Sequence, residues 1–274
     1  MHDRAFDPEL CLFCGQVFRF RHVDSGFAGI DGPNVYRLNT SGELIEGDST
    51  AFGSLVRAEL DYDQLWGRLA ELGPELVGMR RQGHRMLRPS DPVETFFCFL
   101  CSSNNNIKRI TQMIDKLASF GEPMPDHTFQ RFPTAQVIAE VGEARLRELG
   151  FGYRARGISR AAQKLANEPD WFNSLKKASY ADAAGQLREL DGVGPKLADC
   201  IALFALDHGE AVPVDTHLWQ AFCRTYRPDW RGVTLTEKRM RDVGEFMRDR
   251  FGDLAGFAHH VLFVDNLMRR PVNK

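Results

Sequence analysis

The first 50 residues alternate apolar and polar side chains in the manner of β-strands that are buried on one face. Residues 16–21, Gln-Val-Phe-Arg-Phe-Arg, follow a period of two. Residues 35–38 and 43–46 are two shorter strand candidates, and the Thr-Ser-Gly sequence at 40–42 between them suits a hairpin loop. Asp-Gly-Pro-Asn at residues 31–34 is a turn sequence. This part of the chain predicts a small antiparallel sheet.

From about residue 60 onward, the apolar positions recur at helical spacing. Three leucines mark a first helix, which a Gly-Pro pair at 73–74 interrupts, and the Arg-rich stretch 76–87 is a second helix candidate. Asp91 can cap a third helix, in which Pro92 suits the first turn and Glu94 occupies the capping-box position. The third helix is apolar on every side, so we expect it to be buried.

The rest of the chain alternates helical patterns with breaks that contain glycine or proline. One of these helices carries an apolar stripe over residues 107–117 and stops at Gly121. A length of 274 residues suits one large domain or two. We therefore predict an α+β fold: an N-terminal α/β domain with antiparallel strands over residues 1–88, followed by a mostly α-helical domain over residues 89–274.

Composition and charge narrow the class of protein. The chain is 43% hydrophobic and 26% charged, which is ordinary for a globular protein and excludes a disordered, collagen-like or coiled-coil chain. Its 35 Lys and Arg against 37 Asp and Glu argue against indiscriminate binding to polyanions. A local basic face is still expected, because residues 145–164 hold six Lys or Arg and one Glu, and residues 80–88 hold four Arg.

The sequence contains neither a signal-peptide pattern nor a membrane span. The N-terminus has no apolar core, and the densest apolar stretch, residues 95–101, is far shorter than the ~20 residues that cross a bilayer. We expect an intracellular protein, in the cytoplasm and nucleoid of a bacterium or the nucleus of a eukaryote, with no membrane partner.

Cysteine usage argues for a reducing compartment. The six cysteines are too few for a disulfide framework in a chain of this length: Cys11, Cys14, Cys98, Cys101, Cys200 and Cys223. The first four form two Cys-x-x-Cys pairs with the spacing of zinc ligands. However, one pair precedes a strand and the other lies on a helix predicted to be buried, where cysteine usually serves packing. We favour packing over zinc.

Residues 190–200 carry the most informative motif. Their sequence, Leu-Asp-Gly-Val-Gly-Pro-Lys-Leu-Ala-Asp-Cys, places Gly192 and Gly194 between a helix over 181–189 and a helix that starts at Pro195. Glycines allow close approach of another surface, and a helix N-terminus offers unpaired N–H groups and a positive dipole end. The pattern indicates a helix-hairpin-helix that grips a DNA phosphate, although an ordinary helical hairpin would look similar.

Lys196 and Asp215 are the candidate chemical groups. Lys196 lies near the helix N-terminus beside a partly apolar face, and both features should lower its pKa, as a nucleophilic amine requires. A surface lysine that binds phosphate is the plainer interpretation. Asp215 precedes a helical pattern and suits an N-cap, and it could also stabilise a cation near Lys196. His217 could contact a phosphate or lie on the helix surface.

A second metal hypothesis involves these residues. Asp215 and His217, together with His259 or His260, could imitate a two-histidine, one-carboxylate iron site. The spacing fits only loosely, so we predict no metal.

The run from Leu190 to His217 resembles the DNA base-excision glycosylases that share a helix-hairpin-helix and a Gly/Pro-rich segment ending in an aspartate. Within that superfamily the chain resembles the eukaryotic-type 8-oxoguanine DNA glycosylases. The further matching segments are residues 15–19, 91–94, 101–110, 149–156 and 255–263. The Cys-Ser-Ser-Asn-Asn-Asn sequence at 101–106 is the most specific of them, because asparagine is a poor helix former with no general reason to cluster. The resemblance covers nearly the whole chain.

This resemblance implies a mechanism. Lys196 would attack C1′ of the damaged nucleotide, expel the base and form a Schiff base, and β-elimination would then nick the strand. Asp215 would stabilise the transition state. The nucleotide would be flipped out of the duplex. The resemblance also implies a set of DNA contacts: Asn104 filling the vacated space, Arg109 and Arg154 on the orphaned cytosine, Tyr153 wedged into the stack, Gly192 and Gly194 at a phosphate, and His217 on a phosphate.

The resemblance likewise implies the lesion pocket. Cys200 and Phe263 would sandwich the base, and the carbonyl of Gly15 would accept from its N7–H, a donor that normal guanine lacks. His259 stands where the family places a Gln that reads the Watson–Crick edge. A neutral imidazole offers one donor and one acceptor, so His259 either replaces part of that contact or shifts the choice of lesion.

Other classes stay open at this point. A non-catalytic DNA-binding module or damage sensor would keep the hairpin glycines without needing both Lys196 and Asp215, and an alkyl-base glycosylase generally lacks the hairpin lysine. Branches with an iron–sulfur cluster carry four closely spaced C-terminal cysteines, whereas no cysteine follows Cys223 here. We expect a monomer that needs no cofactor and binds double-stranded DNA containing an oxidised purine. By family resemblance, a structural cation is conceivable at the hairpin carbonyls.

Overall fold

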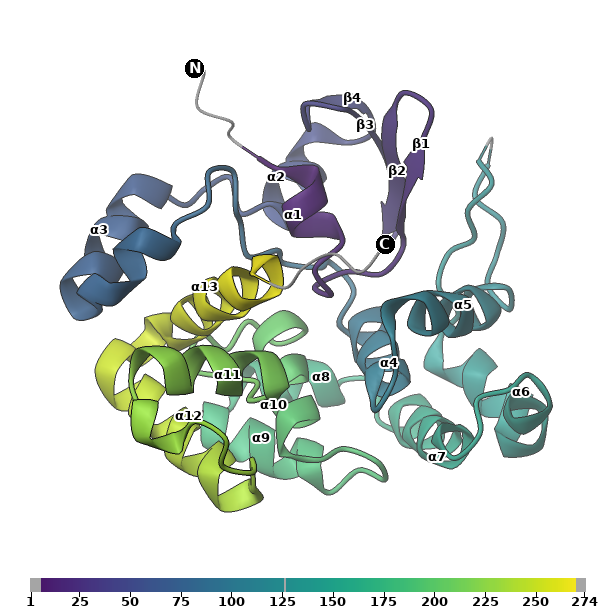
Figure 1. The fold of residues 1–274 in the computed structure, drawn as a ribbon. Helices are drawn as coiled ribbons and strands as arrows, with labels where there is room; N and C mark the ends of the chain where they lie inside the picture. Colours follow the sequence, from purple (N-terminus) through teal and green to yellow (C-terminus); the bar gives the residue numbers. More distant parts are fainter. Residues whose placement is uncertain (1–5, 126, 270–274) are drawn as a thin grey trace.

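A computed structural model describes residues 6–125 and 127–269, and its four strands form one antiparallel sheet near the N-terminus (Figure 1). The strands are neighbours in chain order: β1 (Phe20–Val23), β2 (Gly26–Asp31), β3 (Asn34–Asn39) and β4 (Leu44–Glu46). Asp31 pairs with Asn34, which confirms the predicted turn. The strand predicted at 16–21 begins only at Phe20. Every residue of β2 is buried, so β2 has no period of two and the pattern missed it.

Helices make up most of the remaining chain. Their bounds are α1 (Pro8–Leu12), α2 (Ser49–Leu55), α3 (Tyr62–Leu72), α4 (Pro92–Ser102), α5 (Ile107–Ala118), α6 (Ala135–Glu148), α7 (Arg154–Asn167), α8 (Trp171–Lys177), α9 (Tyr180–Arg188), α10 (Pro195–Phe204), α11 (Thr216–Thr225), α12 (Glu237–Phe251) and α13 (Ala255–Met268), with short 3₁₀ helices η1 (Pro74–Met79), η2 (Pro228–Trp230) and η3 (Gly252–Leu254). The predicted α+β class is confirmed. None of the described helices is long and apolar enough to cross a membrane.

The start of α4 follows the predicted capping in part. The Asp91 side chain accepts from the backbone N–H groups of Val93 and Glu94, and Pro92 occupies the first turn. The predicted capping box does not form. The Glu94 carboxylate instead faces Arg19, with Glu94 Oε1 3.3 Å from Arg19 Nη1. The helix itself is buried as predicted, with eight consecutive buried residues.

The helix predicted at 76–87 is also wrong. Only the short η1 forms, and the chain then runs without regular structure to residue 90. Gly83 adopts φ +73° there, a conformation that does not belong to a helix. The consequence for the site is that residues 84–87 have no regular structure, and some of their backbone groups bond side chains from elsewhere.

Three buried clusters hold the molecule together. One lies around the sheet with α1 and α2, one around α4, α7 and α10, and one around α11, α12 and α13. Trp66 and Leu69 of α3 and Leu76 of η1 belong to the third cluster. The boundary predicted at residue 88 stays a prediction, and a core shared by the early helix α3 and the last three helices crosses it.

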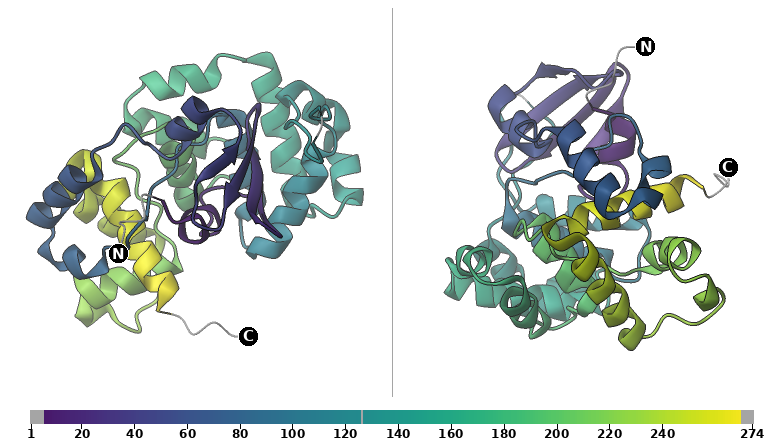
Figure 2. Two further views of the ribbon diagram at one scale, coloured as in Figure 1. Left: turned by 90° about the horizontal axis from the view of Figure 1, so that it is seen from above. Right: turned by 90° about the vertical axis from the view of Figure 1, so that its left-hand side faces the viewer.

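Helix α13 occupies a central position. It passes between the N-terminal sheet and the lower helices in Figure 1 and in the right-hand view of Figure 2. Ten of its fourteen residues are buried. Side chains on α13 can therefore meet both the N-terminal segment before β1 and the hairpin between α9 and α10.

Candidate active site

A cavity of about 770 Å³ opens where six parts of the chain converge. They are the segment before β1, the end of α4 with the following loop and the start of α5, the α9–α10 hairpin with α10, the start of α11, the start of α12, and α13. A volume of this size is typical of small-molecule sites. Ten of the thirteen predicted site residues line it: Gly15, Asn104, Gly192, Gly194, Lys196, Cys200, Asp215, His217, His259 and Phe263. Arg109, Tyr153 and Arg154 lie outside it.

The hairpin between α9 and α10 has the predicted form. Gly192 adopts φ +87°, a conformation that L side chains rarely adopt. Gly194 is the N-cap of α10 and has no side chain that could cap the helix. A Cβ at either glycine would meet nothing within 4 Å. The internal packing of the protein therefore leaves this backbone open, and the first turn of α10 presents its N–H groups toward an incoming anion.

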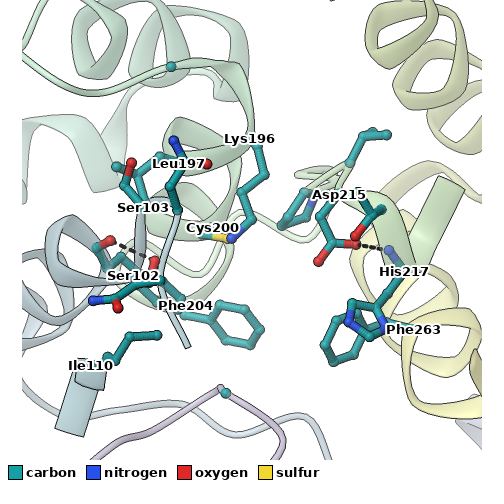
Figure 3. Close-up of a pocket in the computed structure, with 18 of the residues that line it drawn as sticks. Ser102, Ser103, Ile110, Lys196, Leu197, Cys200, Phe204, Asp215, His217 and Phe263 are labelled. Carbon is teal, nitrogen blue, oxygen red and sulfur yellow. Dashed lines mark hydrogen bonds between the residues drawn. The ribbon is translucent and has the colours of Figure 1, made fainter. Parts of the chain in front are cut away.

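Lys196 extends from the first turn of α10 toward Cys200, one turn further along, and Asp215 faces them from α11 (Figure 3). The pKa of Lys196 is raised above its ordinary value, first by the adjacent Cys200 sulfur and then by the Asp215 carboxylate, whereas burial opposes this shift. Burial raises the pKa of Cys200 to about 11. The predicted lowering of the lysine pKa is therefore wrong.

Asp215 has the predicted double position. It is the N-cap of α11, where one carboxylate oxygen accepts from the backbone N–H groups of His217 at 2.8 Å and Leu218 at 2.9 Å. These bonds fix the orientation of the carboxylate toward the cavity (Figure 3). An oriented carboxylate close to an ammonium group is suited to stabilising a developing cation.

The wall of the cavity opposite the hairpin comes from α13. The Phe263 ring packs edge-on against His217, with centroids 5.3 Å apart. His259 is buried, and its Nδ1 has no hydrogen-bond partner among the residues that the structure describes. Burial lowers the pKa of His259 to about 4. The imidazole is therefore neutral near pH 7 and presents one donor and one acceptor.

The three consecutive asparagines do different things. Asn106 caps α5 by accepting from the backbone N–H of Arg109 at 3.0 Å. Asn105 turns inward and donates to the carbonyl of Cys101 at 3.0 Å. Asn104 is exposed at the cavity and adopts φ +45°, which asparagine tolerates better than most residues. The loop therefore presents Asn104 and holds it from both sides.

The side chains predicted to read the opposite strand lie beside this loop. Arg154 is buried and donates to the carbonyls of Ser103 and Asn104, the latter at 3.1 Å. Tyr153 is 60% exposed, and its hydroxyl donates to the Ser103 carbonyl at 3.1 Å. Arg109 is exposed on the first turn of α5. Arg154 thus supports the asparagine loop, and its contact with cytosine stays a prediction.

Sequence reasoning missed several residues of the cavity. Cys14, Gln16 and His260 line it and are buried, and Phe204 and Met240 contribute further apolar surface. The sequence signals for Cys14 and His260 pointed to metal ligation, and Gln16 stood out only as a neighbour of Gly15. No local pattern could place His260 or Met240 in this cavity, because their place depends on how α12 and α13 pack.

Candidate metal ligands do not assemble. Among the residues that the structure describes, no three His, Cys, Asp or Glu side chains are grouped so that they could hold a metal ion. Cys14 contacts His260, with Sγ and Nε2 3.9 Å apart, whereas Cys98 and Cys101 are buried on α4. Cation binding at the hairpin carbonyls stays a prediction.

Comparison with known proteins defines the class. Residues 97–246 match the family described as HhH-GPD superfamily base excision DNA repair protein, where the first term denotes the helix-hairpin-helix. This match covers more than half of the chain, and its range includes the hairpin, Lys196 and Asp215. The chain belongs to this superfamily of base excision DNA repair proteins.

Three relatives are similar over most of the chain. The N-glycosylase/DNA lyase OGG1 of Arabidopsis thaliana is 35% identical, over 95% of this chain and 80% of its own. The 8-oxoguanine glycosylase/lyase of Clostridium acetobutylicum, solved with double-stranded DNA containing cytosine opposite 8-oxoG, has a TM-score of 0.81 at 26% identity, over 95% of this chain and 91% of its own. A protein named MBOgg1, solved with a low-affinity DNA ligand, has a TM-score of 0.85 at 26% identity, over 96% and 93%.

Proposed function

We propose that this protein excises 8-oxoguanine opposite cytosine from double-stranded DNA and then cleaves the strand at the resulting abasic site. The observation that carries this proposal is the meeting of Lys196 and Asp215 in one cavity beside an open helix-hairpin-helix. A DNA-binding module without chemistry has no need for a half-buried lysine opposite an oriented carboxylate. The protein is a DNA glycosylase with lyase activity, as its relatives are named.

The geometry supports the following steps. The flipped nucleotide enters the cavity, and its base lies between Cys200 and Phe263. As the C1′–N9 bond breaks, its electron pair leaves with the base, and the Asp215 carboxylate stabilises the cation that develops on the sugar. Lys196, after losing a proton to solvent, forms the new bond to C1′. The nitrogen then gives a second proton to the departing base. Its lone pair breaks the C1′–O4′ bond, O4′ takes a proton from solvent, and the opened sugar is joined to Lys196 as the Schiff base.

Recognition of the base relies on two residues that line the cavity. The Gly15 carbonyl accepts from the N7–H of the oxidised purine, and the neutral His259 imidazole meets its Watson–Crick edge. His217 and the first turn of α10 hold phosphates. This chemistry needs no cofactor, and a cation at the hairpin carbonyls would serve structure only. Because its substrate is DNA, we place the protein inside the cell.

Covalent trapping tests the mechanism. Borohydride reduces a Schiff base to a stable adduct, so the wild-type protein should become linked to DNA containing 8-oxoguanine opposite cytosine. The Lys196→Ala protein should give no adduct while it still binds the duplex. An adduct of undiminished yield with Lys196→Ala would mean that another amine is the nucleophile. No base release by the wild type, with binding intact, would favour a damage sensor.

Lesion choice is tested at His259. His259→Gln should change the ratio of single-turnover excision rates on different oxidised purines and leave duplex affinity within about twofold, because the side chain reaches the base and not the backbone. The measurement is a panel of lesions opposite each normal base. An unchanged ratio would show that His259 does not read the lesion.

A further inference from the structure

A network of four buried polar side chains borders the cavity and has no part in the steps above: His84, His260, Cys14 and Gln16. His84 Nε2 lies 2.7 Å from His260 Nδ1, and the two rings are stacked with centroids 4.8 Å apart. His260 Nε2 faces Cys14 Sγ at 3.9 Å, and the Gln16 amide donates to the same sulfur at 3.4 Å. All four side chains are buried.

This network of side chains holds Cys14 and Gln16, the residues on both sides of Gly15, in place. Gln16 donates to the Arg85 carbonyl at 3.1 Å and accepts from the Leu87 N–H at 2.7 Å. The Arg85 N–H donates to Cys11 Sγ at 3.2 Å. Residues 84–87 are thereby bonded to the segment before β1. Gly15 itself adopts φ +94°, so the direction of its carbonyl depends on how its neighbours are held.

The His84–His260 contact then connects that segment to α13. His260 follows His259 and lies one turn before Phe263, so it belongs to the wall against which the base would rest. His84 does not line the cavity. Apolar side chains would fill this space at a lower desolvation cost than two imidazoles, which must be paired once they are buried. What the pair adds beyond packing is a directional bond between α13 and the Gly15 segment.

We propose that the His84–His260 pair is a positioning device for base recognition: it sets the Gly15 carbonyl relative to the α13 wall, so that a base with an N7–H is held correctly for excision. This inference rests on the proposed function. It assigns His84, a residue outside the cavity, to lesion recognition through His260. Lys196 and Asp215 are on other elements. The His260 ring packs edge-on against Phe204 at the far end of α10, with centroids 6.1 Å apart, whereas Lys196 is in the first turn of that helix.

Two activities of the same protein separate this role from a structural one. Excision of 8-oxoguanine needs the base to be held, whereas strand cleavage at a preformed abasic site needs only Lys196 and DNA binding. For His84→Leu we expect the single-turnover rate of excision to fall about tenfold, as for loss of a buried hydrogen bond, while cleavage at the abasic site stays within about twofold. His84→Gln can keep a hydrogen bond to His260 and should restore most of the excision rate.

The controls cover folding and the proposed function. His208→Leu removes a half-buried histidine that bonds the Leu175 carbonyl away from the cavity, and it should change neither activity. If His84→Leu does not fold, Cys14→Ala removes the contact of His260 with the segment before β1, and the same two assays are measured on it. Equal losses in both activities, or no loss of excision, would overturn the inference. No excision by the wild type would instead contradict the proposed function, and the inference with it.

Discussion

Lys196 shows how strongly the reactivity of one residue depends on its neighbours. Cys200 and Asp215 raise its pKa, so it is an ammonium at neutral pH. Only the amine can attack, and below the pKa its fraction grows about tenfold for each pH unit. We therefore expect the rate of cyanoborohydride trapping on a preformed abasic duplex to rise steadily from pH 6.5 to 9.

The control for this pH dependence is Cys200→Ala. It removes the largest cause of the raised pKa, so the amine fraction and the trapping rate should be higher than in the wild type at each pH, with the same rise from pH 6.5 to 9. Trapping on an abasic site avoids the role of Cys200 against the base. A wild-type rate that is flat over this range would show that deprotonation of Lys196 does not limit the step.

The sequence predicted which residues belong to the site better than it predicted the surroundings of each side chain. It located Lys196, Asp215 and Asn104, and the cavity brings all three together. It predicted the wrong direction for the lysine pKa, because it considered only the helix dipole and an apolar face and left out the effect of Cys200 and Asp215 on the ammonium. His84 and His260 are 176 positions apart, and no local pattern connects them.

The α9–α10 hairpin offers a prediction at the scale of an element. Gly192→Ala places a Cβ at φ +87° and should lower the free energy of unfolding by about 1 kcal/mol. Gly194 has φ −84° and open space around it, so Gly194→Ala should leave stability unchanged. Both should weaken DNA binding, because each added methyl group stands where a phosphate approaches the backbone.

Denaturant unfolding and fluorescence anisotropy on one duplex measure these two effects separately. The matched pair isolates the interface, since Gly194→Ala alters it without altering the fold. Full DNA affinity in Gly194→Ala would mean that the hairpin does not contact the phosphate backbone closely.

Among the elements, those with strong end signals were predicted best. Asp91 and Pro92 begin α4 as expected, and Pro195 begins α10. Strand β2 was missed because burial on both faces removes alternation. The helix predicted at 76–87 was wrong. Helical spacing of apolar residues does not show where backbone groups bond to distant side chains and not to their own helix, and the Gln16 side chain bonds the backbone of Arg85 and Leu87.

In the whole molecule, many of the basic side chains are paired with acidic ones. The Lys and Arg of residues 145–164 predicted a basic face, yet several of them have acidic partners in the structure: Arg145 with Glu148, Arg147 with Glu143, Lys164 with Glu168, and Arg156 and Arg160 with Asp191. These exposed pairs contribute little to stability. Their effect is to reduce the positive potential that DNA meets, which is consistent with a chain of net charge −2.

Asp191 is the acidic group that matters most, because it belongs to the hairpin that should meet the phosphates. Its carboxylate lies 3.3 Å from Arg156 and 2.5 Å from Arg160, both on α7. Asp191→Asn removes the carboxylate that pairs with Arg156 and Arg160, so both guanidinium groups can bind DNA phosphates. Affinity for undamaged duplex should rise about threefold to tenfold at low salt, and the slope of log K against log salt should steepen by about one.

Glu168→Gln provides the matched control for Asp191→Asn. It makes the same change in net charge at the far end of α7, where Glu168 pairs with Lys164. Anisotropy titrations from about 50 to 200 mM salt should separate the two, since only a charge beside bound DNA changes the number of counterions released. If both variants steepened the slope equally, net charge would govern affinity. If neither did, the hairpin face of α7 would lie away from DNA, and the placement of the duplex over Gly192 and Gly194 would be wrong.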